Sequence, residues 1–180
     1  MKYLYLAAPP GTEAEAFAAV RDRVQNEFGI PVMTMQMPDL EFAYDGNRRQ
    51  YASFSVLELL LRLCPANALK LLAVTECDLF IPVLTFVFGH AQLGGRVGVI
   101  SFARLRQEFY GLVPHREVFL ERAYKEALHE TGHTFGLVHC PDRNCAMSLA
   151  TNVRQIDLKQ AAFCGPCSAR LARRKEEELS

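Results

Sequence analysis

Three histidines and a glutamate stand at spacings that suit a metal centre in the segment 129–139. His129 and His133 are four residues apart, so on a helix both imidazole rings project from one face and can share one ion. Glu130 lies about 100° round the helix from His129 and flanks such an ion rather than binding it. A carboxylate in that place can accept a proton from a metal-bound water.

Gly136 and His139 complete the pattern H-E-x-x-H-x-x-G-x-x-H. Gly136 allows the chain to leave the helix sharply, at a positive φ that other residues rarely adopt. The turn can return His139 as a third ligand. Three protein ligands leave a position for water, which is typical of catalytic zinc, and zinc lowers the pKa of that water to about 7. A chance helix with histidines is the alternative, and the five specified positions make it rare.

Four cysteines follow this segment directly. Cys140 and Cys145 flank a short polar loop, and Cys164 and Cys167 form a C-x-x-C pair before a predicted helix. Two close pairs across a gap of 18 residues favour a tetrahedral structural zinc site. The alternatives are two disulfides or a redox-active pair, and the redox reading lacks a thioredoxin-like βαβ context. Because Cys140 adjoins His139, a second zinc would also fix the segment that presents the third histidine.

Hydrophobic periodicity predicts the elements that position these residues. Strands are expected over residues 2–8, 30–37, 69–74, 84–92 and 96–102. Helices are expected over residues 13–28, 49–63, 117–137 and 165–178, with Thr12 as a candidate cap and Gly29 as the end of the first helix. Two early βα units imply an α+β domain with an α/β-like N-terminal layer, in which helices pack on a mixed sheet.

The composition predicts one globular domain. The chain has 180 residues, of which 50% are apolar and 22% charged, and its formal net charge is zero. We expect a subdomain 1–136 with the active-site helix and a smaller subdomain 137–180 with the cysteine site. Zero net charge argues against nucleic acid as a partner. No apolar run reaches the roughly 18 residues of a spanning helix, so we expect no membrane partner, and we expect a monomer.

The first ten residues carry one lysine and a short apolar run. A signal peptide is one interpretation, but a buried first strand is favoured because the run is short and an ordinary helix follows. Without an export signal, the six cysteines are interpreted as metal ligands and core thiols, with Cys64 and Cys77 as buried small apolar residues. The expected location is therefore the cytoplasm.

The joined motifs resemble those of the archaemetzincins, a family of metzincin zinc metallopeptidases. The resemblance rests on His129-Glu130-x-x-His133-x-x-Gly136-x-x-His139-Cys140, on Cys145-x-Met147 and on Cys164-x-x-Cys167. It implies a metzincin-type zincin fold, with a twisted mixed sheet, an active-site helix and a small C-terminal subdomain. It also implies two zinc ions, one catalytic on the histidines and one structural on the cysteines. Glu130 would be the general base, and Met147 would be the Met-turn residue beneath the histidines.

The expected function is hydrolysis of peptide bonds in peptides or unfolded segments by a zinc-activated water. A catalytically weak or silent zinc- or peptide-binding protein is the alternative, and zero net charge disfavours a zinc-ribbon nucleic-acid module. Leu149 stands where some metzincins carry a tyrosine that polarises the scissile carbonyl. Zinc and backbone would then carry more of the transition-state stabilisation.

The expected strand 84–92 is the candidate sheet edge for an extended substrate, and residues 148–154 are the candidate wall beyond the cut bond. His90 could bond substrate, although a rim position is favoured. Arg48 and Arg49 could bind a carboxylate or form structural ion pairs, and His115 is expected at the surface or as a helix cap.

Overall fold

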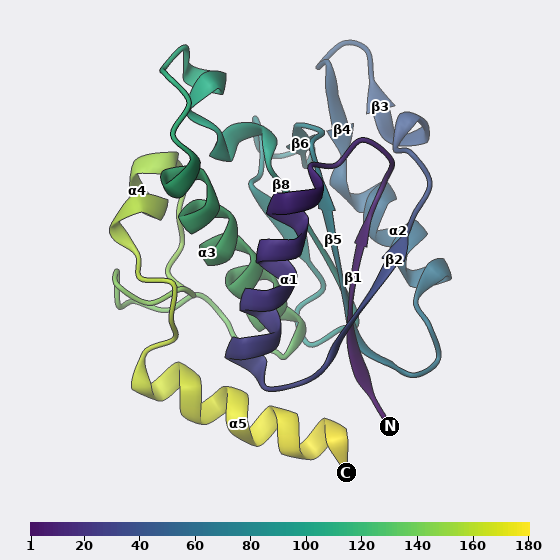
Figure 1. Ribbon diagram of the computed structural model, residues 1–180, viewed down its shortest axis with the longest axis vertical. Coiled ribbons are helices and arrows are strands. Elements are labelled where there is room, and N and C mark those ends of the chain that lie inside the picture. The colour runs from purple at the N-terminus through teal and green to yellow at the C-terminus, as the bar shows by residue number, and fades with distance from the viewer.

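A twisted five-stranded sheet forms the centre of the computed structural model, which describes residues 1–180 (Figure 1). The strand order is β2-β1-β5-β8-β7, parallel except for β7, which is antiparallel to β8 at one edge. In this order the strands are Val32–Gln36, Tyr3–Ala8, Ala68–Thr75, Val97–Ser101 and Gly89–Ala91. The expected α+β class with a mixed sheet is confirmed.

Helices cover both faces of this sheet. The helices α1 (Ala14–Phe28) and α3 (Arg116–Thr134) lie on one face, and α2 (Ser53–Leu63) lies on the other (Figure 1). Successive residues of β5 point to opposite faces, so Leu72 packs with α1 and α3 while Leu71 packs with α2. Both faces are covered, which explains why β5 reads as a continuous apolar run.

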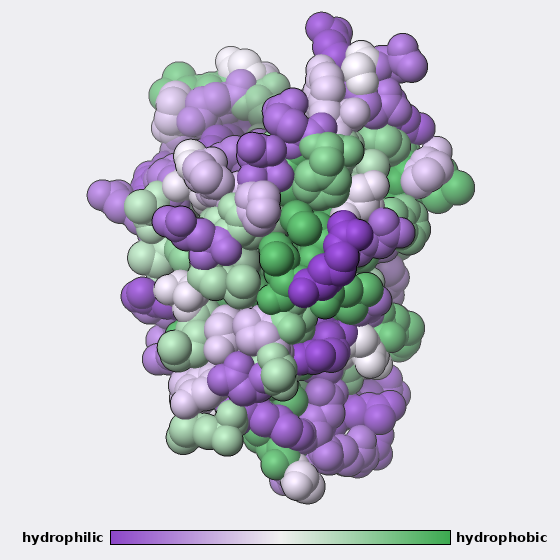
Figure 2. Space-filling model, turned by 90° about the vertical axis from the view of Figure 1, so that its right-hand side faces the viewer, coloured by the Kyte–Doolittle hydropathy of each residue, from purple (hydrophilic) through white to green (hydrophobic).

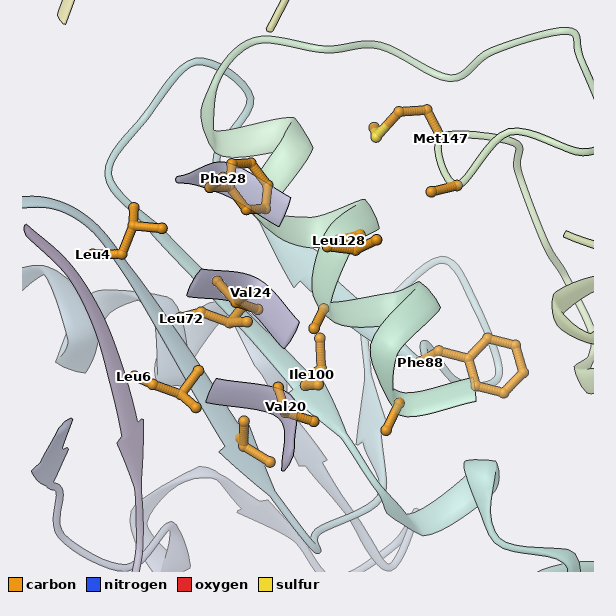
Figure 3. Packing of buried hydrophobic residues seen from close by; sticks show 14 of the residues in the cluster. Leu4, Leu6, Val20, Val24, Phe28, Leu72, Phe88, Ile100, Leu128 and Met147 are labelled. Atoms are coloured by element: carbon orange, nitrogen blue, oxygen red, sulfur yellow. The ribbon is translucent and has the colours of Figure 1, made fainter. Parts of the chain in front are cut away.

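The core between the sheet and α1 and α3 extends under the C-terminal segment. Leu72, Val24, Ile100 and Leu128 belong to one buried cluster, which also contains Met147 (Figure 3). The edge of the sheet at β2 is exposed to solvent. β2 has only one neighbouring strand, and its residue Met33 is 45% exposed. Figure 2 shows this side, where hydrophobic residues gather near the centre among polar ones.

A second sheet of three short strands corrects the expected start of the second helix. Its order is β3-β4-β6, with bounds Tyr44–Asp45, Gln50–Ala52 and Leu79–Phe80. The helix expected from residue 49 begins only at Ser53, because Tyr51 and Ala52 pair with β6 and Gln50 pairs with β3. Arg49 adopts φ 55°, which ends the hairpin turn and cannot start a helix.

The expected strand 84–92 is also wrong in part, because only β7 (Gly89–Ala91) joins the main sheet. Arg48 contacts the irregular segment before β7. Its guanidinium donates to Leu84 O at 3.0 Å and to Pro82 O at 3.2 Å, and it lies over the Phe80 ring. These carbonyls are therefore engaged outside any ladder, and Arg48 has a structural role.

The expected cap of α1 is wrong as well. Thr12 Oγ1 donates to Pro9 O at 3.0 Å, and the N-cap residue is Glu13, whose side chain caps nothing. Gly29 ends α1 at φ 63°, as expected.

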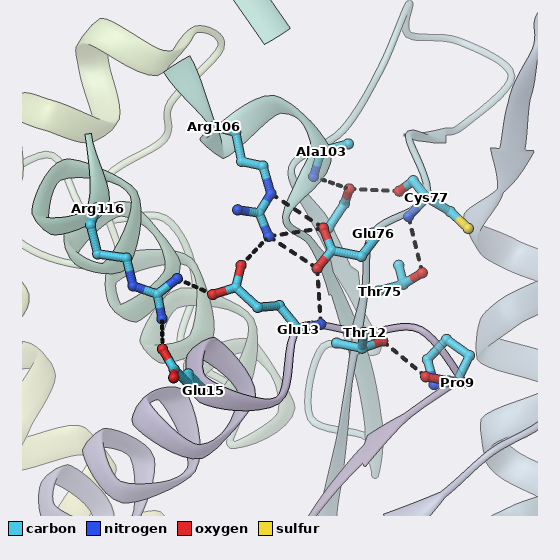
Figure 4. A network of polar contacts seen from close by, with 11 residues as sticks. Pro9, Thr12, Glu13, Glu15, Thr75, Glu76, Cys77, Ala103, Arg106 and Arg116 are labelled. Carbon is cyan, nitrogen blue, oxygen red and sulfur yellow. Dashed lines mark hydrogen bonds and ion pairs between the residues drawn. The ribbon is translucent and has the colours of Figure 1, made fainter. Parts of the chain in front are cut away.

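An ionic cluster holds the start of α1 instead of a cap (Figure 4). Arg106 donates to Glu13 at 2.8 Å and to Glu76 at 3.1 Å, and Arg116 pairs with both Glu13 and Glu15. The cluster ties α1 to the end of β5 and to the start of α3, the helix that carries the histidines.

The C-terminal region contains a helix that periodicity missed. The helix α3 ends at Thr134, three residues before the expected end, and α4 (Val153–Leu158) lies in a segment expected to be irregular. The helix α5 (Gly165–Leu179) crosses the base of the molecule (Figure 1). Three 3₁₀ helices cover Glu41–Ala43, Ala103–Leu105 and Gln107–Tyr110. None of the helices is long and apolar enough to cross a lipid bilayer.

Candidate metal centres

The first candidate metal centre consists of His129, His133 and His139, whose ligand atoms all lie within 4.8 Å of one another. The Nε2 atoms of His129 and His133 are 3.0 Å apart. Two nitrogens held about 2.0–2.1 Å from a tetrahedral ion would be about 3.3 Å apart. The separation of the two histidines on α3 is therefore close to the one that a shared zinc ion requires.

Backbone carbonyls orient the rings of His129 and His133. His129 Nδ1 donates to Ala146 O at 2.8 Å, and His133 Nδ1 donates to Leu137 O at 2.7 Å. A carbonyl can only accept, so each Nδ1 carries the proton and each Nε2 presents a lone pair to its neighbour. Facing lone pairs with no proton between them fit a cation in this place.

The turn after α3 returns the third histidine. Gly136 adopts φ 83°, and its N–H donates to His133 O at 2.8 Å. The ring centroid of His139 then lies 4.9 Å from that of His133. This is the role that the sequence predicted for Gly136, since a positive φ strains other residues.

The surroundings of the three imidazoles lower their pKa values and so favour the neutral form. Burial lowers the pKa of His129 well below 6.5, and the charge of Lys159 lowers it further. Burial also lowers the pKa values of His133 and His139. Neutral imidazole is the form that binds metal, so the environment favours ligation.

Glu130 is 5% exposed beside these histidines. Burial raises its pKa well above 4.5, and the nearby carboxylate of Glu126 raises it further, while Lys159 opposes the shift. The spacing within the motif predicted where Glu130 lies but not its neighbours. Gly89 of β7, Glu126 and Lys159 all lie near Glu130, and no sequence pattern marked them.

A cavity of about 540 Å³ opens over the histidines, a size typical of sites for small ligands. The segment from Leu84 to Ala91 and the segment from Leu149 to Thr151 both line the cavity. The candidate wall after Met147 therefore does border the cavity. Hydrophobic residues make up half of the lining, and Glu126, Glu130 and Lys159 are its buried charged residues.

The second candidate centre consists of Cys140, Cys145, Cys164 and Cys167, whose sulfur atoms lie within 4.8 Å of one another and form no disulfide. The Sγ atoms of Cys140 and Cys164 are 3.7 Å apart. Four sulfurs about 2.3 Å from a tetrahedral zinc would be about 3.8 Å apart, so the cluster fits that ion.

Met147 connects the two centres. Its side chain is fully buried, and its backbone O accepts from Cys140 N at 3.0 Å. The preceding residue, Ala146, supplies the carbonyl that orients His129. The loop between the cysteine pairs thus contacts the histidine site directly.

The remaining candidates have mixed outcomes. His90 lines the cavity, and its Nδ1 lies 2.9 Å from Ser53 Oγ, which itself donates to Phe80 O. His115 caps α3, as expected. Cys64 and Cys77 are only half-buried, so the prediction of buried thiols is wrong in degree.

Comparisons with known proteins agree with these motifs. The family model described as peptidase family M54 matches residues 62–173. The archaemetzincin of Methanocaldococcus jannaschii is 43% identical over 130 residues, which cover 72% of this chain and 70% of that protein. The archaemetzincin of Methanopyrus kandleri is 44% identical over 133 residues, which cover 74% of this chain and 72% of that protein.

Solved structures are similar over almost the whole chain. The crystal structure of archaemetzincin from Methanopyrus kandleri has a TM-score of 0.86 and 37% identity, covering 97% of this chain and 96% of that one. The crystal structure of a zinc-dependent peptidase from Methanocorpusculum labreanum has a TM-score of 0.81 and 29% identity, covering 93% and 99%.

Proposed function

This chain belongs to peptidase family M54, the archaemetzincins, and is a zinc metallopeptidase; from this premise we propose that Glu130 is its general base and that His129, His133 and His139 bind the catalytic zinc. The observation that carries the proposal is the buried carboxylate of Glu130 beside two Nε2 lone pairs that face each other at 3.0 Å. The substrates are peptides or unfolded segments that can enter the cavity.

The protein's own residues supply orientation and proton transfer. Bound zinc would lower the pKa of a water molecule and polarise the scissile carbonyl. Ala146 O and Leu137 O keep His129 and His133 in position. Glu130 accepts the proton of the attacking water and passes it to the leaving amine. Burial raises the pKa of Glu130, which makes its carboxylate a stronger proton acceptor.

The edge strand β7 is the proposed support for an extended substrate. It pairs with β8 on one side only, which leaves its other edge free for a peptide strand. Leu149 is 56% exposed and lines the cavity in the place where a tyrosine would polarise the carbonyl. With leucine at this position, bound zinc and backbone groups would supply the stabilisation of the oxyanion.

A second zinc on the four cysteines would be structural, which gives two zinc ions per chain. The sulfur separation of 3.7 Å supports this count. We further propose a monomer that acts in the cytoplasm without a nucleic-acid partner, and the zero formal net charge supports the last point.

The test combines a zinc count with cleavage of a peptide library. We expect two zincs per chain and cleavage that Glu130→Ala lowers by about 10²-fold or more. Glu117→Ala is the matched control, because Glu117 is an exposed glutamate on the same helix. Cleavage that persists in Glu130→Ala would contradict the role of Glu130. Zinc binding without any cleavage would favour the alternative, a catalytically silent zinc- or peptide-binding protein.

A further inference from the structure

Two oppositely charged residues are buried in the wall of the cavity. The side chains of Lys159 and Glu126 are 1% and 5% exposed, and Lys159 Nζ lies 3.6 Å from Glu126 Oε1. Both residues line the cavity. Glu126 is one turn before Glu130 on α3, and Lys159 directly follows α4. The pair is therefore part of the cavity wall next to the proposed general base.

Neither member of this pair has a full set of partners. Lys159 Nζ donates to Ala146 O at 3.4 Å, and its contact with Glu126 is longer than a normal hydrogen bond. Glu126 Oε1 accepts no hydrogen bond, although it is buried. An ammonium group has three donors, so at least one N–H of Lys159 and the acceptor Glu126 Oε1 lack a hydrogen-bond partner next to each other. Buried polar groups in this state are unfavourable unless a ligand or water completes them.

The pair also lies close to the metal centre. Ala146 O, to which Lys159 donates, is the carbonyl that accepts from His129 Nδ1 at 2.8 Å. The segment Leu149–Thr151 lines the same cavity, and it is the wall expected beyond the cut bond. A substrate side chain that follows the cut bond would thus point toward Lys159 and Glu126.

We propose that Lys159 and Glu126 recognise a side-chain carboxamide, that of glutamine or asparagine, on the substrate residue after the cut bond. This inference rests on the proposed function and names the substrate class of the same site. The amide oxygen accepts from Lys159 Nζ, and the amide nitrogen donates to Glu126 Oε1. The O and N atoms of an amide are about 2.2 Å apart. Hydrogen bonds of about 2.9 Å can therefore reach two protein atoms that are 3.6 Å apart.

Other side chains fit the pair less well. A carboxylate would face Glu126, and a cation would face Lys159, and each would add a net charge to a buried site. An apolar side chain would leave both polar groups without partners, which is how hydrogen-bonding sites reject analogues that lack the matching group.

The test compares peptides that differ only at the residue after the cut bond, which is Gln, Glu, Met or Lys. Methionine is similar to glutamine in length but lacks the amide. For the zinc-loaded protein we expect kcat/KM for Gln to exceed that for each of the others by about tenfold or more. In Lys159→Met the ratio of Gln to Met should fall toward one. Lys125→Met is the matched control, since Lys125 is a lysine on α3 that does not line the cavity, and it should retain the ratio.

Binding separates this inference from the proposed function. The same four peptides are titrated into zinc-loaded Glu130→Ala, with and without Lys159→Met. A preference for Gln in binding without cleavage by the wild type would support the inference and contradict the peptidase proposal. Cleavage with equal rates, or with a preference for Glu, Lys or Met, would overturn the inference alone. If Lys159→Met does not fold, the comparison of the four peptides on the wild type still decides.

Discussion

Gly89 of β7 lies directly against the side chain of Glu130 on α3. A Cβ atom added at Gly89 would stand 2.5 Å from Glu130 Cγ and 2.7 Å from its Oε1. Real Cβ atoms do not approach other heavy atoms so closely, so the absence of a side chain at Gly89 is what lets the sheet edge and the carboxylate meet. This one contact therefore fixes the position of the proposed base relative to β7, the strand proposed to hold the substrate.

Gly89→Ala should consequently displace Glu130 and impair catalysis. Because a shift of about 1 Å in a catalytic group can cost about 10²-fold in rate, we expect kcat/KM to fall by about that factor. Steady-state kinetics and a zinc count measure the effect, and the zinc content should not change. Gly46→Ala is the control, since a Cβ at Gly46 meets nothing within 4 Å. Full activity in Gly89→Ala would show that the base is not held this way.

Met147 should be sensitive to shape because it packs against α3 between the two helical histidines. A Cβ at Gly132 would lie 2.5 Å from Met147 Sδ. We expect Met147→Ala to lower the free energy of unfolding by about 2–5 kcal/mol and Met147→Leu by less than about 1.5 kcal/mol. Urea denaturation of the zinc-loaded proteins tests this order. Equal losses in the two variants would contradict tight packing at this position.

Removal of one cysteine ligand should release one zinc and weaken the other. In Cys164→Ser we expect the zinc count to fall from two to one. A structural zinc contributes about 10 kcal/mol or more of binding free energy, so Tm should drop by more than about 5 °C. The affinity of the histidine site should also fall, because Cys140 N is bonded to Met147 O beside that site.

Cys77→Ser provides the comparison, since Cys77 lies outside the cysteine cluster. It should keep two zincs, measured by elemental analysis and by competition with a chelator. A Cys164→Ser protein that retains two zincs would refute the structural site.

The pH dependence of stability should carry the signature of the buried histidines. In the metal-free protein, burial lowers the pKa of His129 well below 6.5. Below about pH 6.5 the unfolded chain then binds more protons than the folded chain. The contribution of His129 to the free energy of unfolding is therefore fully present above that pH and is lost as the pH falls toward the lowered pKa. The raised pKa of Glu130 acts in the opposite direction, since it favours the folded state at lower pH.

The difference between wild type and His129→Gln isolates the histidine contribution. Urea unfolding of both metal-free proteins from pH 8 to pH 5 should give a wild-type free energy of unfolding that declines relative to the variant below about pH 6.5. A constant difference across this range would be inconsistent with a neutral, buried His129.

Local spacing in the sequence was sufficient to predict which residues form the candidate metal centre. His129 and His133 share a helix face because the helical period is 3.6 residues, and Gly136 marks the turn that returns His139. Because His139 and Cys140 are adjacent in the sequence, the two candidate centres must be neighbours in any fold that forms both of them. The apolar run of β5 likewise identified the central strand, because burial on both faces leaves a continuous signal. The sequence also indicated the family, since these motifs occur together.

Tertiary structure alone decided what surrounds those ligands. Gly89 contacts Glu130, and Lys159 contacts Glu126, although the residues of each pair are far apart in the sequence. Helical or strand periodicity cannot predict such contacts. Short elements were misread for the same reason: β4 and β7 are strands because partners pair with them, and Arg48 bonds the carbonyl of Leu84 in the segment before β7. Local residue spacing therefore predicts the candidate metal centre, whereas the walls of the cavity and the proposed choice of substrate depend on contacts that only the folded chain creates.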